Sequence, residues 1–459
     1  MKKIILAAVM LSSFLVTACS SGSGGQTFAE AHDAFQTKLT SQQNDQDEIP
    51  EPPAGLFELD YYDSKVGKLA AYVSGDPGDG GKHPLMIWVV GGWGNGIDDF
   101  PWSYAEWDND QSAAAFREAG ILMMYPSFRG GNGNPGYYET LFGEVDDIVS
   151  AYEYAASLPY VDPDRIYLGG HSTGGTRVLL ASEYTDQFRA VFAFGPVDNV
   201  KYHNRSEFTF DTGSNDEYKL RSPIYWLQDI KSPTFVIEGE DGNAVNLRNI
   251  EKKSKNDHVS CFVVEGADHF SVLAPVNALL AGKIAADTGA QPNITLTQAE
   301  LQAAMKQPPV ISYPAMVPYY NEMLSFHMEM PAIWEEYDNS DEYIQYAFSS
   351  AYQDDNFWDS LWMYVDVYGL DEEFTYDEFV QLLNGESDIY ECSTLDVNGQ
   401  TALIAQGKVP DQEGNLYLNK VAVFQKEDRL LEFWFYIPEE YEKLAEPIIS
   451  EVIESIILE

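Results

Sequence analysis

Short apolar runs alternate with amphipathic stretches along the first half of the chain. Between residues 56 and 287 these runs are rich in β-branched and aromatic residues, and several are almost continuously apolar. Strands that are buried on both faces have this pattern, because helices cover both sides of a mostly parallel sheet. We expect strands at residues 68–74, 85–90, 121–125, 165–169, 190–194, 234–237 and 259–264.

Helical periodicity fills the intervals between these strands. We expect helices at residues 112–119, 142–158, 173–183 and 272–287. Strands that alternate with helices of this length are typical of an α/β fold with a mostly parallel central sheet. The sequence therefore predicts one α/β domain over residues 56–290.

The pattern changes after this domain. Residues 291–312, which follow Gly289 and contain Pro292, Pro308 and Pro309, predict a linker. One short helix should begin there at the capping box Thr297-Gln298-Ala299-Glu300. Residues 313–459 contain longer alternating runs with many aromatics and a closing amphipathic helix at 440–456. This region predicts a smaller α+β domain. It loosely resembles the PsbP-like sandwiches, which implies that it binds a partner, such as an envelope protein.

The N-terminus has the pattern of a processing signal. Lys2 and Lys3 precede an apolar run that is too short to span a bilayer, and small residues lead to Cys19. This arrangement resembles the lipobox of bacterial lipoproteins, which implies a signal peptide at 1–19 and a membrane anchor through lipid on Cys19. Residues 20–55 are polar and predict a flexible tether. We expect an exported protein, at the outer membrane or periplasmic face of a Gram-negative cell or on the surface of a Gram-positive one.

The charge balance narrows the possible partners. The chain has 73 acidic and 27 basic residues, a net charge of −46, and 32 acidic against 5 basic residues lie from Tyr313 onward. This acidic surface repels nucleic acid, so we expect no nucleic-acid partner. Beyond Cys19 only Cys261 and Cys392 remain, and no Cys/His cluster has metal-ligand spacing. We expect no metal and no cofactor.

One motif indicates a catalytic site. The predicted strand at 165–169 runs directly into Gly170-His171-Ser172-Thr173-Gly174, which leads into a helix. A G-x-S-x-G motif at a strand-to-helix junction forms a nucleophile elbow, in which glycines permit a strained turn and the serine is exposed. We therefore predict that the domain at 56–290 is an α/β-hydrolase with a mostly parallel central sheet and that Ser172 is its nucleophile. The backbone N–H of Thr173, at the helix N-terminus, is a predicted oxyanion donor.

A serine nucleophile needs a base and an acid, which follow in the order Ser, acid, His in this fold. His269 follows the last predicted strand of the domain and is the predicted base. The acid should follow the strand at 234–237, where the sequence has three carboxylates. We favour Asp241, then Glu240, and place Glu238 last.

Two further loops complete the predicted site. The second oxyanion donor should follow the strand at 85–90, where the N–H of Trp93 or Gly92 can serve. Arg129 lies in the glycine-rich loop Pro126-Ser127-Phe128-Arg129-Gly130-Gly131. It can either bind a substrate carboxylate or brace its own loop.

Several motifs in order resemble the catalytic domain of the prolyl oligopeptidase family of serine peptidases. They are the Arg129 loop, Gly143-Glu144-Val145-Asp146-Asp147, Val161-Asp162-Pro163-Asp164-Arg165-Ile166 before the elbow, and Arg221-Ser222-Pro223-Ile224. The chain departs from the family in three ways. A tether stands where large members have a β-propeller, Val90 precedes the glycine loop, and the family pattern G-x-x-D for the acid falls on Gly242.

The resemblance implies a cell-envelope serine peptidase that forms an acyl-enzyme on Ser172. A carboxylesterase is the first alternative, because the fold alone does not separate amide from ester substrates. The second alternative is a non-catalytic envelope protein that binds a partner on a degraded hydrolase scaffold. The expected substrates are peptides or small esters.

Overall fold

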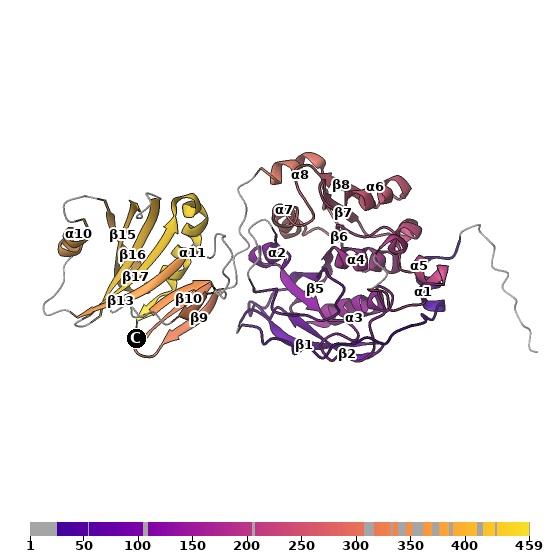
Figure 1. The fold of residues 1–459 in the computed structure, drawn as a ribbon, viewed down its shortest axis with the longest axis horizontal. Helices are drawn as coiled ribbons and strands as arrows, with labels where there is room; N and C mark the ends of the chain where they lie inside the picture. The colour runs from indigo at the N-terminus through magenta and orange to yellow at the C-terminus, as the bar shows by residue number, and fades with distance from the viewer. Residues whose placement is uncertain are drawn as a thin grey trace, which may run out of the picture.

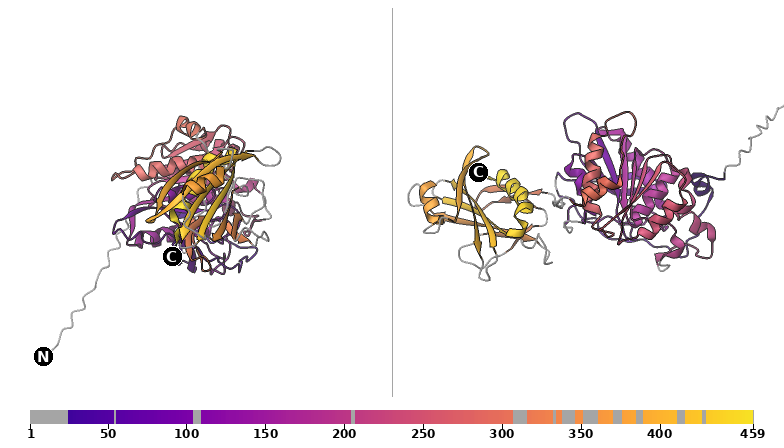
Figure 2. Two further views of the ribbon diagram at one scale, coloured as in Figure 1. Left: turned by 90° about the vertical axis from the view of Figure 1, so that its left-hand side faces the viewer. Right: turned by 90° about the horizontal axis from the view of Figure 1, so that it is seen from above.

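This computed structural model describes residues 25–458 apart from 54, 104–108, 204–206, 307–315, 332–333, 338–345, 351–360, 370–375, 385–388, 411–415 and 427–428. Cys19 and the predicted signal peptide lie outside the described residues. Figures 1 and 2 show two regions, the first built on one sheet and the second on two. None of the described helices is long and apolar enough to cross a membrane.

The first region is built on one eight-stranded sheet (Figure 1). Its strands are β1 (Glu58–Ser64), β2 (Gly67–Val73), β3 (His83–Val89), β4 (Leu122–Pro126), β5 (Val161–His171), β6 (Val191–Phe194), β7 (Thr234–Gly239) and β8 (Val259–Val264). They lie in the order β1-β2-β4-β3-β5-β6-β7-β8. The pairs β1/β2 and β2/β4 are antiparallel, and every later pair is parallel. This confirms the predicted α/β-hydrolase fold with a mostly parallel sheet.

Helices cover both faces of this sheet. They are α2 (Ala114–Glu118), α3 (Gly143–Ser157), α4 (Thr173–Tyr184), α5 (Asn215–Lys219), α6 (Ala244–Lys253) and α7 (Leu273–Ala286). In β3, Met86 and Trp88 join one buried cluster with α2 and α7, whereas Leu85 and Ile87 join another with α3, α4 and α6. Alternate residues of a strand point to opposite faces, so a strand between two helix layers must be apolar throughout.

The predicted elements of this region are all present within a few residues of their expected bounds. Strand β1 and helices α5 and α6 were not predicted. Helix α5 has only five residues. Strand β1 has the burial pattern of an edge strand, with exposed and intermediate positions and only Tyr62 buried. Helix α6 is rich in Asn, Lys and Arg and buries only Ala244, Leu247 and Ile250. In both cases too few apolar residues are present for the pattern to stand out.

The prediction of a flexible tether over residues 20–55 is wrong for residues 25–53. Helix α1 (Phe28–Ala34) begins at a capping box formed by Thr27 and Glu30 and buries Phe28 in the core. The following segment also binds the hydrolase region, since the N–H of Thr40 donates to Thr209 and the N–H of Asp45 donates to Gly130. These bonds pair positions that are far apart in the sequence, so composition could not reveal them.

The predicted linker at 291–312 also lies partly on the hydrolase region. Helix α8 (Gln298–Ala304) begins at the predicted capping box of Thr297 and Glu300. Leu301 of α8, with Ile294 and Leu296 before it, is buried in the same cluster as α7. The domain boundary at 290 is therefore too early, and the packed chain continues to about Met305. The end of the predicted linker, from residue 307, lies outside the described residues.

The second region is antiparallel and has two sheets. Its strands are β9 (Met316–Asn321), β10 (Phe326–Pro331), β11 (Trp334–Tyr337), β12 (Tyr346–Ser350), β13 (Trp362–Gly369), β14 (Glu391–Val397), β15 (Gln400–Pro410), β16 (Leu416–Lys426), β17 (Arg429–Pro438) and β18 (Ile457–Leu458). Seven strands lie in the order β11-β12-β13-β17-β16-β15-β14, and three in the order β18-β10-β9. The helices are α10 (Tyr376–Asn384) and α11 (Glu442–Ser455).

Helix α11 closes the core of the second region. Ile448, Ile449 and Val452 pack in one cluster with Phe433 and Phe435 of β17. This arrangement confirms the predicted smaller α+β domain, whereas the PsbP-like resemblance stays a prediction.

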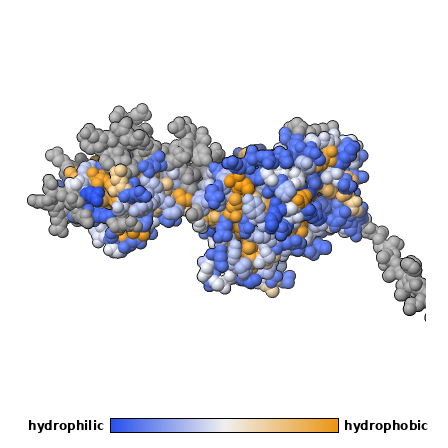
Figure 3. Space-filling view, turned by 90° about the horizontal axis from the view of Figure 1, so that it is seen from below, coloured by the Kyte–Doolittle hydropathy of each residue, from blue (hydrophilic) through white to orange (hydrophobic). Residues whose placement is uncertain are grey.

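Cys261 of β8 and Cys392 of β14 are both free thiols. The face of the molecule in Figure 3 is largely hydrophilic, with apolar side chains in separate patches.

Candidate active site

The predicted site residues lie at one edge of the eight-stranded sheet. Ser172 directly follows β5, Glu238 and Gly239 end β7, and His269 lies in the loop between β8 and α7. The glycine loop at 91–94 directly follows β3. These strands are parallel, so their carboxyl ends meet at the same edge, where open α/β sheets place their ligands.

Ser172 occupies a strained turn between β5 and α4. Its φ of 59° and ψ of −119° are unfavourable for a residue with a side chain. The flanking glycines make this turn possible, because a Cβ on Gly170 would lie 2.8 Å from the Val89 carbonyl oxygen and one on Gly174 only 2.1 Å from it. This geometry is that of the predicted nucleophile elbow.

Glu238 is the carboxylate that contacts the predicted base. His269 Nδ1 lies 2.9 Å from Glu238 Oε2, and Glu238 is fully buried. The N–H of Gly239 donates to Glu238 Oε1 at 2.8 Å, and this hydrogen bond helps to hold the carboxylate beside His269. A carboxylate oxygen accepts, so Nδ1 of His269 carries the proton and leaves Nε2 as the free base.

The preference for Asp241 as the triad acid is therefore wrong, and so is the second choice, Glu240. Both are exposed. The backbone N–H of Asp241 donates to Ala267 and that of Glu240 donates to Val264, so this turn lies against the chain that leads to His269. Sequence reasoning expected β7 to end at residue 237, but the strand continues to Gly239 and includes Glu238.

Two glycines make room for Glu238 and His269. A Cβ on Gly242 would lie 2.5 Å from Glu238 Oε1, at the position where the family pattern expects an aspartate. A Cβ on Gly195 would lie 2.4 Å from His269 Cε1 and 2.5 Å from Glu238 Oε2. The departure from G-x-x-D is thus matched by a longer acid, Glu238, which lies four positions before Gly242 and within β7.

His171 joins the nucleophile turn to the base. Its ring lies against the ring of His269, with centroids 4.4 Å apart, and its Nε2 donates to the backbone carbonyl of His269 at 2.9 Å. Burial, with a smaller effect of the nearby His269, lowers the pKa of His171 to about 3, so the ring is neutral. Among the described residues, Ser172 Oγ makes no hydrogen bond to His269; such bonds often tighten when substrate binds.

The predicted oxyanion loop lies beside the elbow. Gly92 has a φ of +86°, which favours glycine, and its carbonyl accepts the hydroxyl of Thr173. Within the described part of the chain, the N–H groups of Gly92, Trp93 and Thr173 donate no backbone hydrogen bond. All three predicted donors therefore remain available to an oxyanion.

Residues that sequence reasoning did not single out hold this loop. Arg177 of α4 donates to the Gly94 carbonyl at 3.0 Å and to Asn95 Oδ1 at 2.9 Å, and both side chains are buried. Asn95 in turn donates to Glu144 Oε1 at 3.0 Å. Their positions one turn into α4 and just after the glycine loop were visible in the sequence, but nothing there showed that they pair.

Arg129 braces its own loop and is not placed to bind substrate. Its Nε donates to Asp147 at 2.8 Å and its Nη1 donates to Glu139 at 2.9 Å, with 4% of the residue exposed. A Cβ on Gly143 would lie 1.9 Å from Arg129 Nη1, so the glycine of that motif makes room for the guanidinium. The paired carboxylates raise the pKa of Arg129, although its burial opposes this.

A cleft of about 740 Å³ opens beside the site. Val90 and Gly91 of the oxyanion loop line it, and so does Phe270, which directly follows His269. Polar groups also reach it from Asp98, Asn109, Gln111 and Ser112. The cleft is thus large enough for a short substrate and has both apolar and polar walls.

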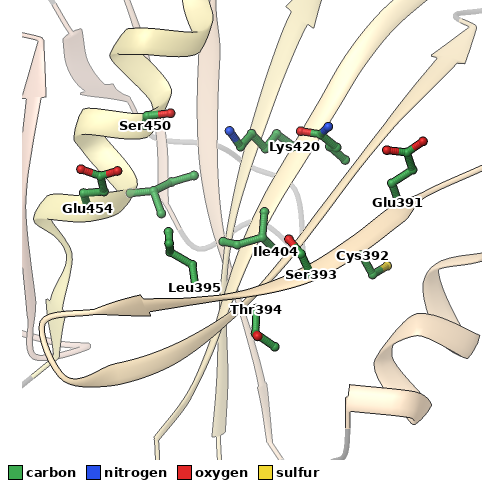
Figure 4. A pocket seen from close by; sticks show the side chains of 11 residues that line it. Glu391, Cys392, Ser393, Thr394, Leu395, Ile404, Lys420, Ser450 and Glu454 are labelled. Carbon is green, nitrogen blue, oxygen red and sulfur yellow. The ribbon is translucent and has the colours of Figure 1, made fainter.

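Another cavity, of about 320 Å³, lies in the second region between β14, β15 and α11 (Figure 4). Its polar lining includes Lys420, whose Nζ donates to Glu446 at 2.6 Å, and Ser450. Its lining residues include no histidine. It therefore has no histidine base like His269 beside its hydroxyl and thiol groups.

Comparisons with known proteins agree with this geometry. Residues 107–271 match the model of the prolyl oligopeptidase family. The chain is 26% identical over 158 residues to the uncharacterized peptidase YtmA of Bacillus subtilis, across 31% of this chain and 62% of that protein. The chain thus spans about three fifths of this curated relative. The family match includes Ser172, Glu238 and His269 and confirms the predicted resemblance and a serine hydrolase.

Solved structures of hydrolases are similar to part of this chain at low identity and with TM-scores below 0.5. A puromycin-hydrolyzing peptidase of Mycobacterium tuberculosis is 19% identical, with a TM-score of 0.42, over 52% of this chain and 40% of that one. The Pyrococcus horikoshii acylaminoacyl peptidase is 16% identical, with a TM-score of 0.42, over 54% and 44%. A Pyrobaculum calidifontis esterase is 15% identical, with a TM-score of 0.39, over 51% and 87%.

Proposed function

We propose that this chain, whose residues 107–271 match the prolyl oligopeptidase family, is a serine peptidase that cleaves short peptides through an acyl-enzyme on Ser172. The observation that carries the proposal is the contact between His269 and Glu238 at the carboxyl edge that also holds the Ser172 elbow. No other role explains a strained serine, an oriented imidazole and free backbone donors in one place.

The geometry assigns each group a step. His269 Nε2 takes the proton of Ser172 as the hydroxyl attacks the substrate carbonyl, and it later gives that proton to the leaving amine. Glu238 keeps His269 in the tautomer with Nδ1–H and stabilises the imidazolium. The N–H groups of Thr173 and of Gly92 or Trp93 stabilise the oxyanion, and water then hydrolyses the acyl-enzyme.

A peptide amide is favoured over an ester by sequence relationship. The matched family is described as that of prolyl oligopeptidases, and the B. subtilis relative is named a peptidase. The cleft beside the site adds a place for residues on either side of the cleaved bond. The alternative of a carboxylesterase differs in substrate and shares the same triad.

The test is covalent labelling followed by turnover. A fluorophosphonate should label the wild type and the control Ser157→Ala, which changes an exposed serine of α3, but not Ser172→Ala. The wild type should then hydrolyse a short peptide amide, and Ser172→Ala should lose nearly all of that activity.

Each outcome separates the hypotheses. If Ser172 is labelled and the protein hydrolyses a matched ester but not its amide, the protein is a carboxylesterase and not a peptidase. Absence of labelling at Ser172 in a folded protein would contradict the enzyme and favour a partner-binding protein on a hydrolase scaffold.

We further propose that the enzyme is exported and anchored at the cell envelope through lipid on Cys19. The support is the charged, apolar and small-residue order that ends at Val16-Thr17-Ala18-Cys19. The strongly acidic second region, which lies after the catalytic domain, is proposed to bind an envelope partner.

A further inference from the structure

A buried histidine far from the triad faces two carboxylates. His32 lies on α1, and only 3% of the residue is exposed. Its ring stacks on Phe142, with centroids 4.2 Å apart, and its Nε2 lies 3.1 Å from the Phe142 carbonyl oxygen. Because a carbonyl oxygen only accepts, Nε2 is the protonated nitrogen of the ring.

The other ring nitrogen has no hydrogen-bond partner. His32 Nδ1 is buried and makes no hydrogen bond with any described residue. It lies 3.8 Å from Asp33 Oδ1 and 4.0 Å from Asp146 Oδ1. The three ligand atoms of these residues all lie within 4.8 Å of one another. A buried lone pair without a partner is costly, and a cation between it and the two carboxylates would remove that cost.

A protonated imidazolium would be one such cation, but burial acts against it. Removal from water is the largest effect on the pKa of His32 and lowers it, whereas the nearby Asp146 raises it by less. At 3.8 Å from Asp33 and 4.0 Å from Asp146, His32 Nδ1 is also too far from either carboxylate for a hydrogen bond, so its lone pair is placed to bind a metal ion.

We propose that His32, Asp33 and Asp146 form a site for a divalent transition-metal ion, with Zn²⁺ as the best fit, which clamps α1 to α3. One imidazole nitrogen and two carboxylate oxygens are ligands that Zn²⁺ accepts at about 2.0–2.2 Å. Ligands of a tetrahedral ion with such bonds lie about 3.4 Å apart. The separations from His32 Nδ1, 3.8 Å to Asp33 Oδ1 and 4.0 Å to Asp146 Oδ1, are close to this value, and the two carboxylates must move toward each other as the ion binds.

The surroundings of the three ligands support a metal site. The Phe142 carbonyl orients the ring through Nε2, as carbonyls do for metal-binding histidines. Tyr184 donates to Asp33 Oδ1 at 2.9 Å and so holds that carboxylate. The Asp33 side chain is 56% exposed, which leaves one side of the site open for water as a fourth ligand.

One lysine competes for this position. Lys65 Nζ lies 2.8 Å from Asp146 Oδ1, the oxygen that faces His32. Its side chain is 60% exposed, so it can move into solvent when an ion binds. Removal of this positive charge should therefore strengthen metal binding, a result that a purely structural ion pair would not produce.

The clamp would join parts of the chain that are distant in sequence. His32 and Asp33 come from α1, and Asp146 lies in the first turn of α3. Helix α1 is also held by Phe28, whose N–H donates to Asp229 at 2.7 Å. A bound ion would add to these contacts and stabilise the N-terminal segment on the catalytic domain.

The test is zinc binding by the full-length protein without an affinity tag, after removal of metal with a chelator. Calorimetric titration with ZnCl₂ should show one site, and zinc should raise the thermal unfolding temperature. His32→Gln keeps a donor for the Phe142 carbonyl but lacks the ligand nitrogen, and it should bind zinc at least about tenfold more weakly. Asp33→Asn should do the same, whereas Lys65→Gln should bind about two- to fivefold more tightly.

The control is His258→Gln, which removes an exposed histidine of the catalytic domain and should leave zinc affinity unchanged. The proposal is overturned if the wild type binds no zinc or if Asp33→Asn and His32→Gln bind as the wild type does. Should His32→Gln fail to fold, the exposed Asp33→Asn decides the question. Weaker binding by Lys65→Gln would also count against the site.

Discussion

Glu238 reaches His269 from within a strand because its side chain is one methylene longer than that of aspartate. Its backbone belongs to β7, and its carboxylate extends over Gly242 to His269. A shorter acid would need to start from the turn beyond the strand, which is where the family pattern has it. The identity of the triad acid thus depends on the length of one side chain and on a glycine that leaves room for it.

This assignment predicts different results for two carboxylates that lie three positions apart. Glu238→Gln should lower kcat by roughly four orders of magnitude, because the imidazole loses the group that holds its tautomer. Asp241→Asn is the matched control and should retain most of the turnover, because Asp241 is exposed. Steady-state kinetics on a peptide amide would measure both. A comparable loss of kcat in Asp241→Asn would show that Asp241, and not Glu238, is the triad acid.

His171 is a positioning residue, because it touches His269 and not the reacting atoms. His171→Phe keeps a ring against His269 but removes the donor to its backbone carbonyl. We expect kcat to fall about tenfold with KM unchanged. A tenfold change corresponds to about 1.4 kcal/mol, which is close to the contribution of one hydrogen bond.

The rescue variant for this position is His171→Gln, whose amide can donate to the same carbonyl and should recover part of the lost kcat. If Phe and Gln gave equal kcat values, the hydrogen bond from His171 would have no role in positioning the base.

Glu183 of α4 gives the protein a pH-dependent stability. It is 3% exposed, and neither carboxylate oxygen has a hydrogen-bond partner among the described residues. Burial raises the pKa of Glu183 well above its usual range, and the nearby Asp229 adds to this. The folded protein therefore keeps a proton that the unfolded chain releases above its ordinary pKa, and stability falls as pH rises from there toward the folded pKa.

Glu183→Gln should remove this dependence. In that pH window its free energy of unfolding should exceed that of the wild type by a margin that grows by about 1.4 kcal/mol for each pH unit. Urea unfolding at pH 5, 6 and 7 would measure the difference. The exposed Glu153→Gln of α3 is the control. A constant difference across these pH values would show that Glu183 is ionised in the folded protein.

At the scale of elements, α8 shows that a stretch with linker composition can belong to a core. The Gly and Pro residues around it suggest a connection, yet Leu301 is fully buried against the α7 cluster. Lys283 of α7 also binds Glu300 of α8 at 2.6 Å. One buried leucine per short helix is enough to attach it, since burial of such a side chain contributes about 2 kcal/mol.

Leu301→Ala should therefore destabilise the catalytic region by about 2–5 kcal/mol, through lost burial and the cavity left behind. Leu382→Ala makes the same chemical change at a residue that is 70% exposed, and it should shift stability by at most about 0.5 kcal/mol. Chemical denaturation, followed by loss of triad activity, would report on the catalytic region. Equal effects of the two substitutions would mean that α8 does not contribute to that core.

For the whole molecule, the packing of residues 25–53 shortens the expected tether. Between Cys19 and the N-cap of α1 at Thr27 lie only residues 20–26. Seven extended residues span at most about 25 Å, so a lipid on Cys19 would hold the catalytic region close to the membrane. The net charge of −46 would at the same time repel it from anionic lipid headgroups.

Cys19→Ser tests the anchor. Without the lipid the protein should leave the membrane fraction, either as a secreted form or as an unprocessed precursor of higher mass, because the thiol is the site of attachment. Fractionation followed by immunoblotting would show this, with Cys261→Ser as the control for loss of a thiol elsewhere. Membrane association equal to that of the wild type in Cys19→Ser would refute the lipid anchor.

The sequence by itself determined the class of fold and the nucleophile. Continuous apolar runs indicate strands that are buried on both faces, and the elbow at Ser172 is read from neighbouring residues whose backbone must make one strained turn. His269 was also found in this way, because its place after the last strand follows from the order of elements. The strands and the elbow depend on residues that are close together in the chain, and His269 depends only on the order of the elements along it.

Only the tertiary structure decided which distant groups meet. It selected Glu238 over Asp241, paired Arg129 with Asp147, placed residues 25–53 and α8 on the catalytic region, and brought His32 to Asp146. The direction of a side chain at a strand end, and the space left for it by a glycine on another segment, depend on packing between elements. Spacing along the chain carries no record of that packing, so these contacts could not be predicted from the sequence.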